Sequence, residues 1–89
     1  MKEQFKSWLI QNGYKEYTAS GNPSTVYSYL KSIDFVCEKE RSNWVELGIK
    51  IDYIIEMYDV GGAKSRFGEK SHRTVINALK RYGAFVKMR

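Results

Sequence analysis

The chain has 89 residues, a formal net charge of +5, one cysteine and one histidine. This length predicts a single domain with a small core, and the two single residues exclude an internal disulfide and a four-ligand Cys/His zinc site. No segment approaches the roughly 20 apolar residues that cross a bilayer, so we expect no membrane partner. The lone thiol and the lack of a signal-like segment predict a cytoplasmic setting.

The N-terminal segment has the spacing of an amphipathic helix. Phe5, Trp8 and Leu9 recur at i, i+3 and i+4 within residues 2–12, which places them on one face. The polar residues 14–21 then predict a loop.

Asn22 and Pro23 predict the start of a second helix, because asparagine caps first-turn amides and proline suits the first helical position. We expect this helix to extend to about Arg41. Its apolar stripe recurs at i, i+4, i+7 and i+11 and consists of Val26, Leu30, Ile33 and Cys37. The thiol in this stripe is expected to be buried and structural.

A short helical turn and a third amphipathic stripe follow. The pair Ser42-Asn43 predicts a cap for a turn around Trp44. Isoleucine also favours strands, but the spacing i, i+3, i+4 and i+7 and the lack of a second strand candidate favour a helix. That stripe consists of Ile51, Ile54, Ile55 and Tyr58, and it ends at Gly61-Gly62.

The C-terminal third predicts a loop and a two-sided helix. Residues 63–70 are rich in Gly, Lys and Arg, and Ser71 is expected to cap a helix from about His72 to Lys87. The sequence therefore predicts an all-α fold, a small bundle of four main helices plus a short helical turn. The expected core residues are Phe5, Trp8, Leu9, Val26, Leu30, Ile33, Cys37, Leu47, Ile51, Ile54, Ile55, Val75, Leu79, Tyr82 and Val86.

The charge is unevenly distributed along the chain. Residues 1–59 hold seven Lys/Arg and nine Asp/Glu, a net charge of −2, whereas residues 60–89 hold eight Lys/Arg and one Asp/Glu, a net charge of +7. A basic segment of this kind is the electrostatic footprint of a polyanion-binding protein. Its cations lead into the final helix and continue along the face opposite the apolar stripe.

Catalysis is not expected. The only imidazole, His72, lies in a basic segment with no nearby carboxylate except Glu69, and the chain has no metal-ligand cluster and no P-loop spacing. We therefore predict no catalytic residues, no cofactor, no metal and no small-molecule substrate.

We expect duplex DNA as the partner, bound chiefly through its phosphates. Arg73 and Asn77 lie one turn apart and are candidates for contacts to base edges, because Arg and Asn read guanine and adenine bidentately. The expected phosphate-binding cations are Lys64, Arg66, Lys70, Arg73, Lys80 and Arg81. His72 belongs to the same basic cluster, and helix starts at Ser24, Thr25 and Ser71 are expected to add hydroxyl and amide contacts.

Three stretches resemble the N-terminal SAM-like core-binding domain of tyrosine recombinases and phage integrases. They are Phe5-Lys-Ser-Trp-Leu-Ile-Gln-Asn-Gly-Tyr14, then Thr25-Val26…Tyr29-Leu30…Ile33, then Lys70-Ser71-His-Arg-Thr74-Val75…Ala78-Leu79…Tyr82…Phe85-Val86. The resemblance covers nearly the whole chain. It implies a bundle of four or five helices that clamps one side of the DNA, while a separate C-terminal domain cuts the strands.

Two features depart from that family. The segment 14–23 is longer than its usual turn between the first two helices, and the catalytic Arg/His/Tyr domain is missing from these residues. The chain is therefore either a fragment of an integrase, with a catalytic recombinase domain as its partner in cis, or a stand-alone relative.

A protein-interaction or regulatory module that docks on an acidic protein is the alternative function. Tyr14, Tyr17, Tyr27 and Phe67 are not needed by the core stripes, and tyrosine is enriched at protein interfaces.

Overall fold

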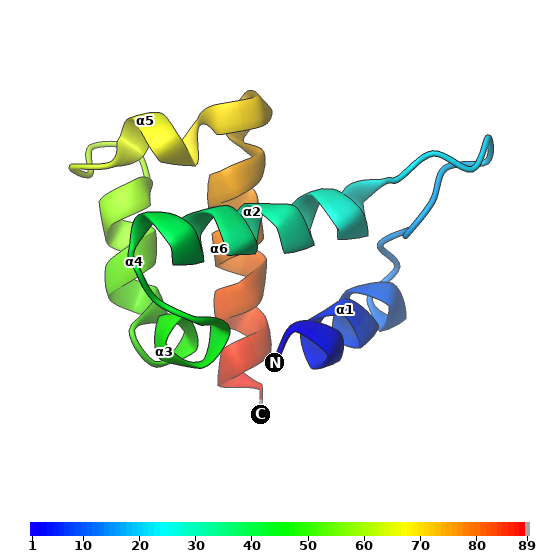
Figure 1. Cartoon of the computed structure of the whole chain (residues 1–89), viewed down its shortest axis with the longest axis horizontal. Coiled ribbons are helices and arrows are strands. Elements are labelled where there is room, and N and C mark those ends of the chain that lie inside the picture. Colours follow the sequence, from blue (N-terminus) through cyan, green and yellow to red (C-terminus); the bar gives the residue numbers. More distant parts are fainter. Residues whose placement is uncertain (89) are drawn as a thin grey trace.

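A computed structural model describes residues 1–88 of the chain, and these form an all-α fold, as predicted. Figure 1 shows α6 running through the molecule, with α2 crossing it, α4 alongside it and α5 near its start. None of the described helices combines the length and apolarity that a bilayer crossing needs. The helices are α1 (Lys2–Gln11), α2 (Thr25–Lys39), α3 (Trp44–Ile49), α4 (Ile51–Tyr58), α5 (Ser65–Gly68) and α6 (Lys70–Lys87).

The core contains most of the residues expected from the helical stripes. Trp8, Leu30, Ile55 and Val86 were also expected there, but they are half-buried and pack against its edge. Their side chains reach the margins of the stripes, where the neighbouring helices cover them only in part. The buried apolar residues are Phe5, Leu9, Val26, Ile33, Val36, Cys37, Leu47, Ile51, Ile54, Tyr58, Val75, Ile76, Ala78, Leu79, Tyr82 and Phe85.

An aromatic cluster ties α1 and α3 to α6. The fully buried ring of Phe5 lies 5.2 Å from that of Tyr82 and 5.9 Å from that of Trp44, measured between centroids. The Tyr82 hydroxyl donates a hydrogen bond of 2.5 Å to the Trp44 carbonyl oxygen. These contacts fix the N-terminal helix and the short helix α3 on the same half of α6.

The predicted cap at Asn43 is confirmed. Its side-chain oxygen accepts a hydrogen bond of 2.9 Å from the Glu46 backbone amide, and its side-chain nitrogen donates to the Glu46 carboxylate at 2.9 Å. This reciprocal pair satisfies a free amide of the first turn and starts α3 at Trp44.

The predicted start of the second helix is wrong by two residues. The helix begins at Thr25, with Ser24 as its extended N-cap, because Asn22 is held in the preceding turn. The Asn22 carbonyl accepts from the Thr18 amide at 2.8 Å, and its own amide donates to the Thr18 hydroxyl at 3.1 Å. Pro23 pairs with Tyr17 in an isolated bridge. The helix also ends at Lys39, short of Arg41.

The approach to α6 also differs from the prediction. Residues 65–68 form the one-turn helix α5 instead of a loop, and Ser71 makes no side-chain cap. Ser71, His72 and Arg73 have left-handed backbones, with φ of 56°, 57° and 69°, so the regular part of α6 begins at Thr74. Just before this corner α5 packs closely on α4: a Cβ on Gly68 would lie 1.9 Å from the Tyr58 carbonyl oxygen.

Leu79 tests the assignment of the core. It is fully buried in α6, so Leu79→Ala should lower the free energy of unfolding by about 2–5 kcal/mol. The exposed neighbour substitution Asn77→Ala should change it by no more than about 0.5 kcal/mol. Denaturant unfolding followed by far-UV circular dichroism measures both, and equal stability of the two variants would contradict the packing.

Candidate nucleic-acid interface

The basic face predicted for α6 lies beside the acidic edge of α4. Lys80 Nζ is 3.1 Å from Asp59 Oδ2, and Arg73 Nη2 is 3.8 Å from Asp59 Oδ1. Lys87 Nζ is 2.8 Å from Asp52 Oδ1. The face is exposed, as expected of an outward side, but Arg73, Lys80 and Lys87 each lie within ion-pair distance of Asp59 or Asp52.

These ion pairs are exposed, and their strength is modest. Exposed pairs are typically worth less than about 1 kcal/mol. Asp59 nevertheless has a lowered pKa, because the Val60 amide donates to its carboxylate and Lys80 adds a hydrogen bond and a positive charge. A phosphate near this edge meets a carboxylate that stays ionised at neutral pH.

Lys64 is also withdrawn from the expected interface. Its Nζ lies 2.6 Å from Glu40 Oε2, and the Tyr58 hydroxyl donates to the same oxygen at 2.7 Å. Burial tends to raise the pKa of Glu40, but the hydrogen bonds from Lys64 and Tyr58 outweigh it and lower the pKa. Burial and the Glu40 carboxylate together raise the pKa of Tyr58. This network fastens the start of α5 to the end of α2.

The outer face of α2 carries a pattern that the sequence reading missed. Tyr27, Lys31, Phe35 and Lys39 recur at i, i+4, i+8 and i+12, so aromatic and cationic side chains alternate along one stripe. Lys70, at the start of α6, places its Nζ 4.2 Å from the centroid of the Phe35 ring. We call these five residues the lysine–aromatic strip.

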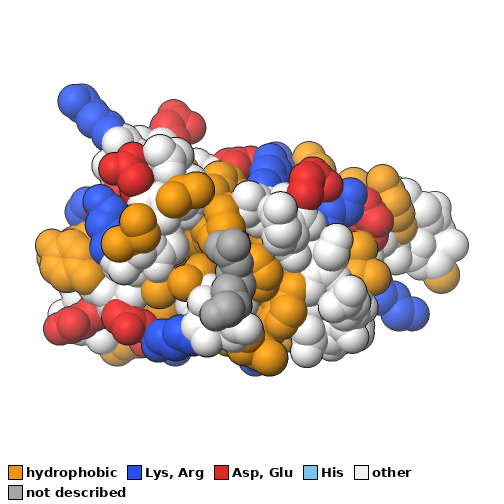
Figure 2. All heavy atoms as spheres, turned by 90° about the horizontal axis from the view of Figure 1, so that it is seen from below, with side chains coloured by type: hydrophobic (Ala, Val, Ile, Leu, Met, Phe, Trp, Pro, Cys, Tyr) orange, Lys and Arg blue, Asp and Glu red, His pale blue; other side chains and the backbone are white. Residues whose placement is uncertain are grey.

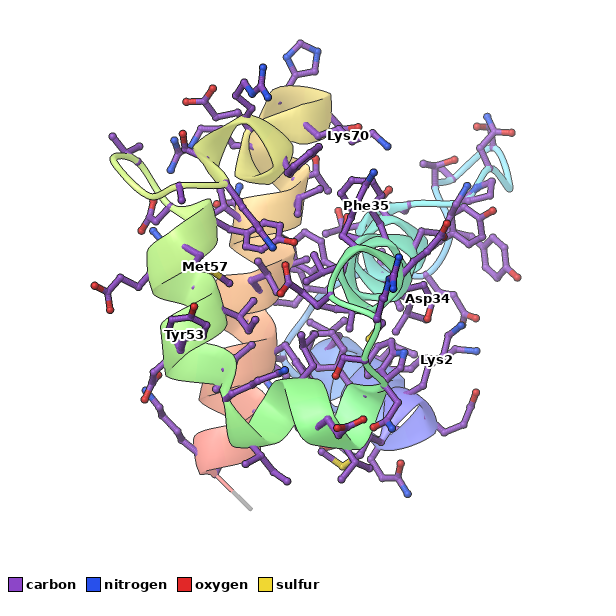
Figure 3. All side chains as sticks on the ribbon, turned by 60° about the vertical axis from the view of Figure 1, so that its left-hand side comes forward. Lys2, Asp34, Phe35, Tyr53, Met57 and Lys70 are labelled. Atoms are coloured by element: carbon purple, nitrogen blue, oxygen red, sulfur yellow. The ribbon has the colours of Figure 1, made fainter. Side chains whose placement is uncertain are left out.

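The lysines of the strip rest on aromatic rings. Lys31 Nζ is 5.4 Å from the Tyr27 centroid, and Lys39 Nζ is 5.5 Å from the Phe35 centroid. Among residues 1–88, none of the three strip lysines has a carboxylate oxygen within ion-pair distance. Figure 3 shows Lys70 and Phe35 on the same side of the molecule, away from Tyr53. Lys15, Arg41, Lys50, Arg66 and Arg81 also lie outside the ion pairs of the described residues, so the strip is distinguished by having its three unpaired lysines beside aromatic rings.

A groove of about 510 Å³ opens between α2 and the start of α6. Asp34 lies in this groove, but its carboxylate accepts hydrogen bonds of 2.8 Å from Lys2 Nζ and Trp44 Nε1. The groove is also lined by Tyr27, Lys31, Phe35, Glu38, Lys70 and Ser71.

The remaining predicted residues are scattered around this centre. Arg66 is exposed on α5, His72 is exposed at the left-handed corner, and Asn77 is exposed on α6 between the groove and the acidic edge. Arg81 lies over the Tyr14 ring at 5.9 Å, on the side of the long α1–α2 loop. Ser24 and Thr25 are half-buried at the start of α2 and do not line the groove.

The described residues offer little for metal binding or thiol chemistry. Residues 1–88 hold no cluster of three His, Cys, Asp or Glu side chains that suits a metal ion. Cys37 is buried as expected, and burial together with Asp34 raises the pKa of its thiol to about 11.

Comparisons with known protein families, with curated proteins and with solved structures find no match. The resemblance to the core-binding domain of recombinases therefore stays a prediction.

The Glu40 network predicts a specific pH dependence of stability. Because folding lowers the Glu40 pKa below its ordinary value of 4.5, its stabilising effect is present above that pH and is lost as the pH falls through the folded pKa. Glu40→Gln should lower the free energy of unfolding by about 1 kcal/mol at pH 7. The difference from the unmodified protein should shrink on acidification.

Glu38→Gln is the matched control, since Glu38 is exposed on the same helix. Denaturant titrations between pH 3 and pH 7 measure both variants. A Glu40→Gln deficit that does not change with pH would contradict the network.

Proposed function

We propose that this domain binds DNA through its phosphates, with the lysine–aromatic strip as the centre of the interface. The observation that supports this most directly is the distribution of ion pairs. The α4 carboxylates hold the cations on one side of α6, whereas Lys31, Lys39 and Lys70 face solvent without a carboxylate partner on the other. Arg66 adds a fourth cation from α5, whose Phe67 ring lies 5.1 Å from Lys39 Nζ.

Energetics favour the transfer of these lysines to phosphate. An exposed cation–π contact is worth about 0.5–1 kcal/mol, whereas a hydrogen bond between charged groups is worth about 1.5–3 kcal/mol. Lysines that rest on rings are also partly ordered before binding. A backbone phosphate can therefore draw them off the rings at small cost.

The ligand that we propose is duplex DNA. The all-α bundle agrees with the resemblance to the recombinase core-binding domain, in which a small bundle clamps one side of the duplex. The proposal is for a binding module without catalysis of its own, so a recombinase domain in cis or on another chain would supply strand cleavage.

A protein partner is a second candidate, and a different surface favours it. Figure 2 shows hydrophobic side chains gathered on the underside of the molecule. Exposed large apolar residues on α3 and α4 are Val45, Ile49 and Tyr53, with 56%, 82% and 60% of each residue accessible. A partner retained after nuclease treatment of the complex would favour this candidate.

Salt-dependent binding tests the DNA proposal. With about four phosphates neutralised, the logarithm of the affinity for duplex DNA should fall with log salt at a slope of roughly −4. The affinity of one small domain should be about micromolar at low salt. Lys31→Ala/Lys70→Ala should reduce the slope by about 2 and weaken all sequences alike.

Lys80→Ala/Lys87→Ala is the matched control, because it removes the same charge from cations that already have carboxylate partners. Fluorescence anisotropy with a labelled duplex measures both variants. The DNA proposal fails if the folded protein does not bind at low salt, or if the two double variants lose the same affinity.

A further inference from the structure

We infer that the groove beside the lysine–aromatic strip accepts an unpaired base, so that the domain prefers DNA with a single-stranded segment next to the duplex. This inference rests on the proposed function, since it adds a base-binding site to the same interface. Two aromatic rings, Tyr27 and Phe35, lie among the lysines of the groove, and phosphate binding alone does not require them.

The size and lining of the groove suit a nucleotide. Its volume of about 510 Å³ lies within the range of small-ligand pockets, roughly 300–1,000 Å³. Tyr27 and Phe35 are separated by eight residues, about 12 Å along α2, with Lys31 between them. Lys31 and Lys70 line the groove together with two carboxylates, of which Asp34 is paired with Lys2 and Glu38 is not. Proteins that bind single strands likewise place cations for the backbone beside aromatic faces for the bases.

Lys70 links phosphate binding to base stacking. Its ammonium group covers the Phe35 ring at 4.2 Å from the centroid. A phosphate that attracts this ammonium group moves it off the ring and leaves the aromatic face open to the base of the same nucleotide. The nucleotide thus binds the Lys70 ammonium group through its phosphate and then the Phe35 ring through its base.

A fully paired duplex does not use this site. Its bases are stacked on their neighbours and their faces are covered, so only an unpaired base can present its face to Phe35 or Tyr27. Stacking on an aromatic side chain is expected to add roughly tenfold in affinity per base.

Glu38 adds a base preference. This exposed carboxylate lines the groove and forms no ion pair or hydrogen bond with another described side chain. It repels phosphate, but it accepts hydrogen bonds from an amino group such as cytosine N4, which thymine lacks. The groove should therefore prefer cytosine to thymine.

The test compares three labelled DNAs by fluorescence anisotropy at one salt concentration. They share the same duplex, which is blunt in the first, carries a short oligo-dC overhang in the second and a short oligo-dT overhang in the third. We expect the oligo-dC overhang to bind about tenfold more tightly than the blunt duplex, with the oligo-dT overhang between them.

Aromatic variants locate the site. Tyr27→Leu and Phe35→Leu keep an apolar side chain but remove the stacking ring, and each should bring the overhang affinities toward that of the blunt duplex. Tyr53→Leu is the matched control, because Tyr53 is exposed on α4, away from the groove (Figure 3). Circular dichroism confirms folding, and the exposed position of Tyr27 keeps the test valid if Phe35→Leu does not fold. Glu38→Gln should narrow the difference between cytosine and thymine.

The outcomes separate this inference from the proposed function. Equal affinity for the blunt and overhang DNAs overturns the inference and leaves phosphate binding intact. An overhang preference that survives both Tyr27→Leu and Phe35→Leu also overturns it, because the base then binds elsewhere. Absence of binding to all three DNAs at low salt overturns the proposed function itself.

Discussion

The position of α6 between α2 and α4 determines the surface chemistry of this domain. One side of α6 is buried, and its fully buried Leu79 and Tyr82 anchor it in the core. Its solvent side is then divided between an edge shared with α4, where Asp52 and Asp59 hold the cations, and a groove shared with α2. Packing thus decides which positive charges are available, although the chain as a whole is basic.

The helices were predictable because the spacing of apolar residues along each segment is a local property of the sequence. Stripes such as Val75, Leu79 and Tyr82 fix both the helical state and the inward face, whatever the neighbours are. The cap at Asn43 was predictable for the same reason, since its partner Glu46 lies three residues away. Features formed within one or two turns can be read directly from the sequence.

Competition between cap signals and contacts outside the helix accounts for the errors. Asn22 has the chemistry of a cap, but the turn with Thr18 uses its backbone and the helix starts later. Ser71 also has the chemistry of a cap, yet it lies in a left-handed corner that directly follows α5, whose Gly68 packs against Tyr58. In both cases a contact outside the helix overrides the propensity of the residue.

The candidate site was predictable only in part, and for a related reason. A count of charges along residues 60–89 drew attention to α6, but it could not show that Asp59 pairs with Arg73 and Lys80. The alternation of Tyr27, Lys31, Phe35 and Lys39 was visible at four-residue spacing, but with the neighbouring charges of opposite sign it contributes no net charge that stands out. A search for aromatic and cationic residues that recur every four positions would have found this stripe.

The acidic edge of α4 has a place in the same scheme. A polyanion approaching α6 meets Asp52 and Asp59 on one side and the unpaired strip lysines on the other. Under the proposed function, the two carboxylates compete with phosphate for Arg73, Lys80 and Lys87. The strip lysines have no such competitor, so phosphate binding is favoured on the α2 side. Of the six expected phosphate-binding cations, the carboxylates of this edge pair with Arg73 and Lys80. The groove beside Phe35 and Lys70 is therefore the proposed position for phosphate and base together.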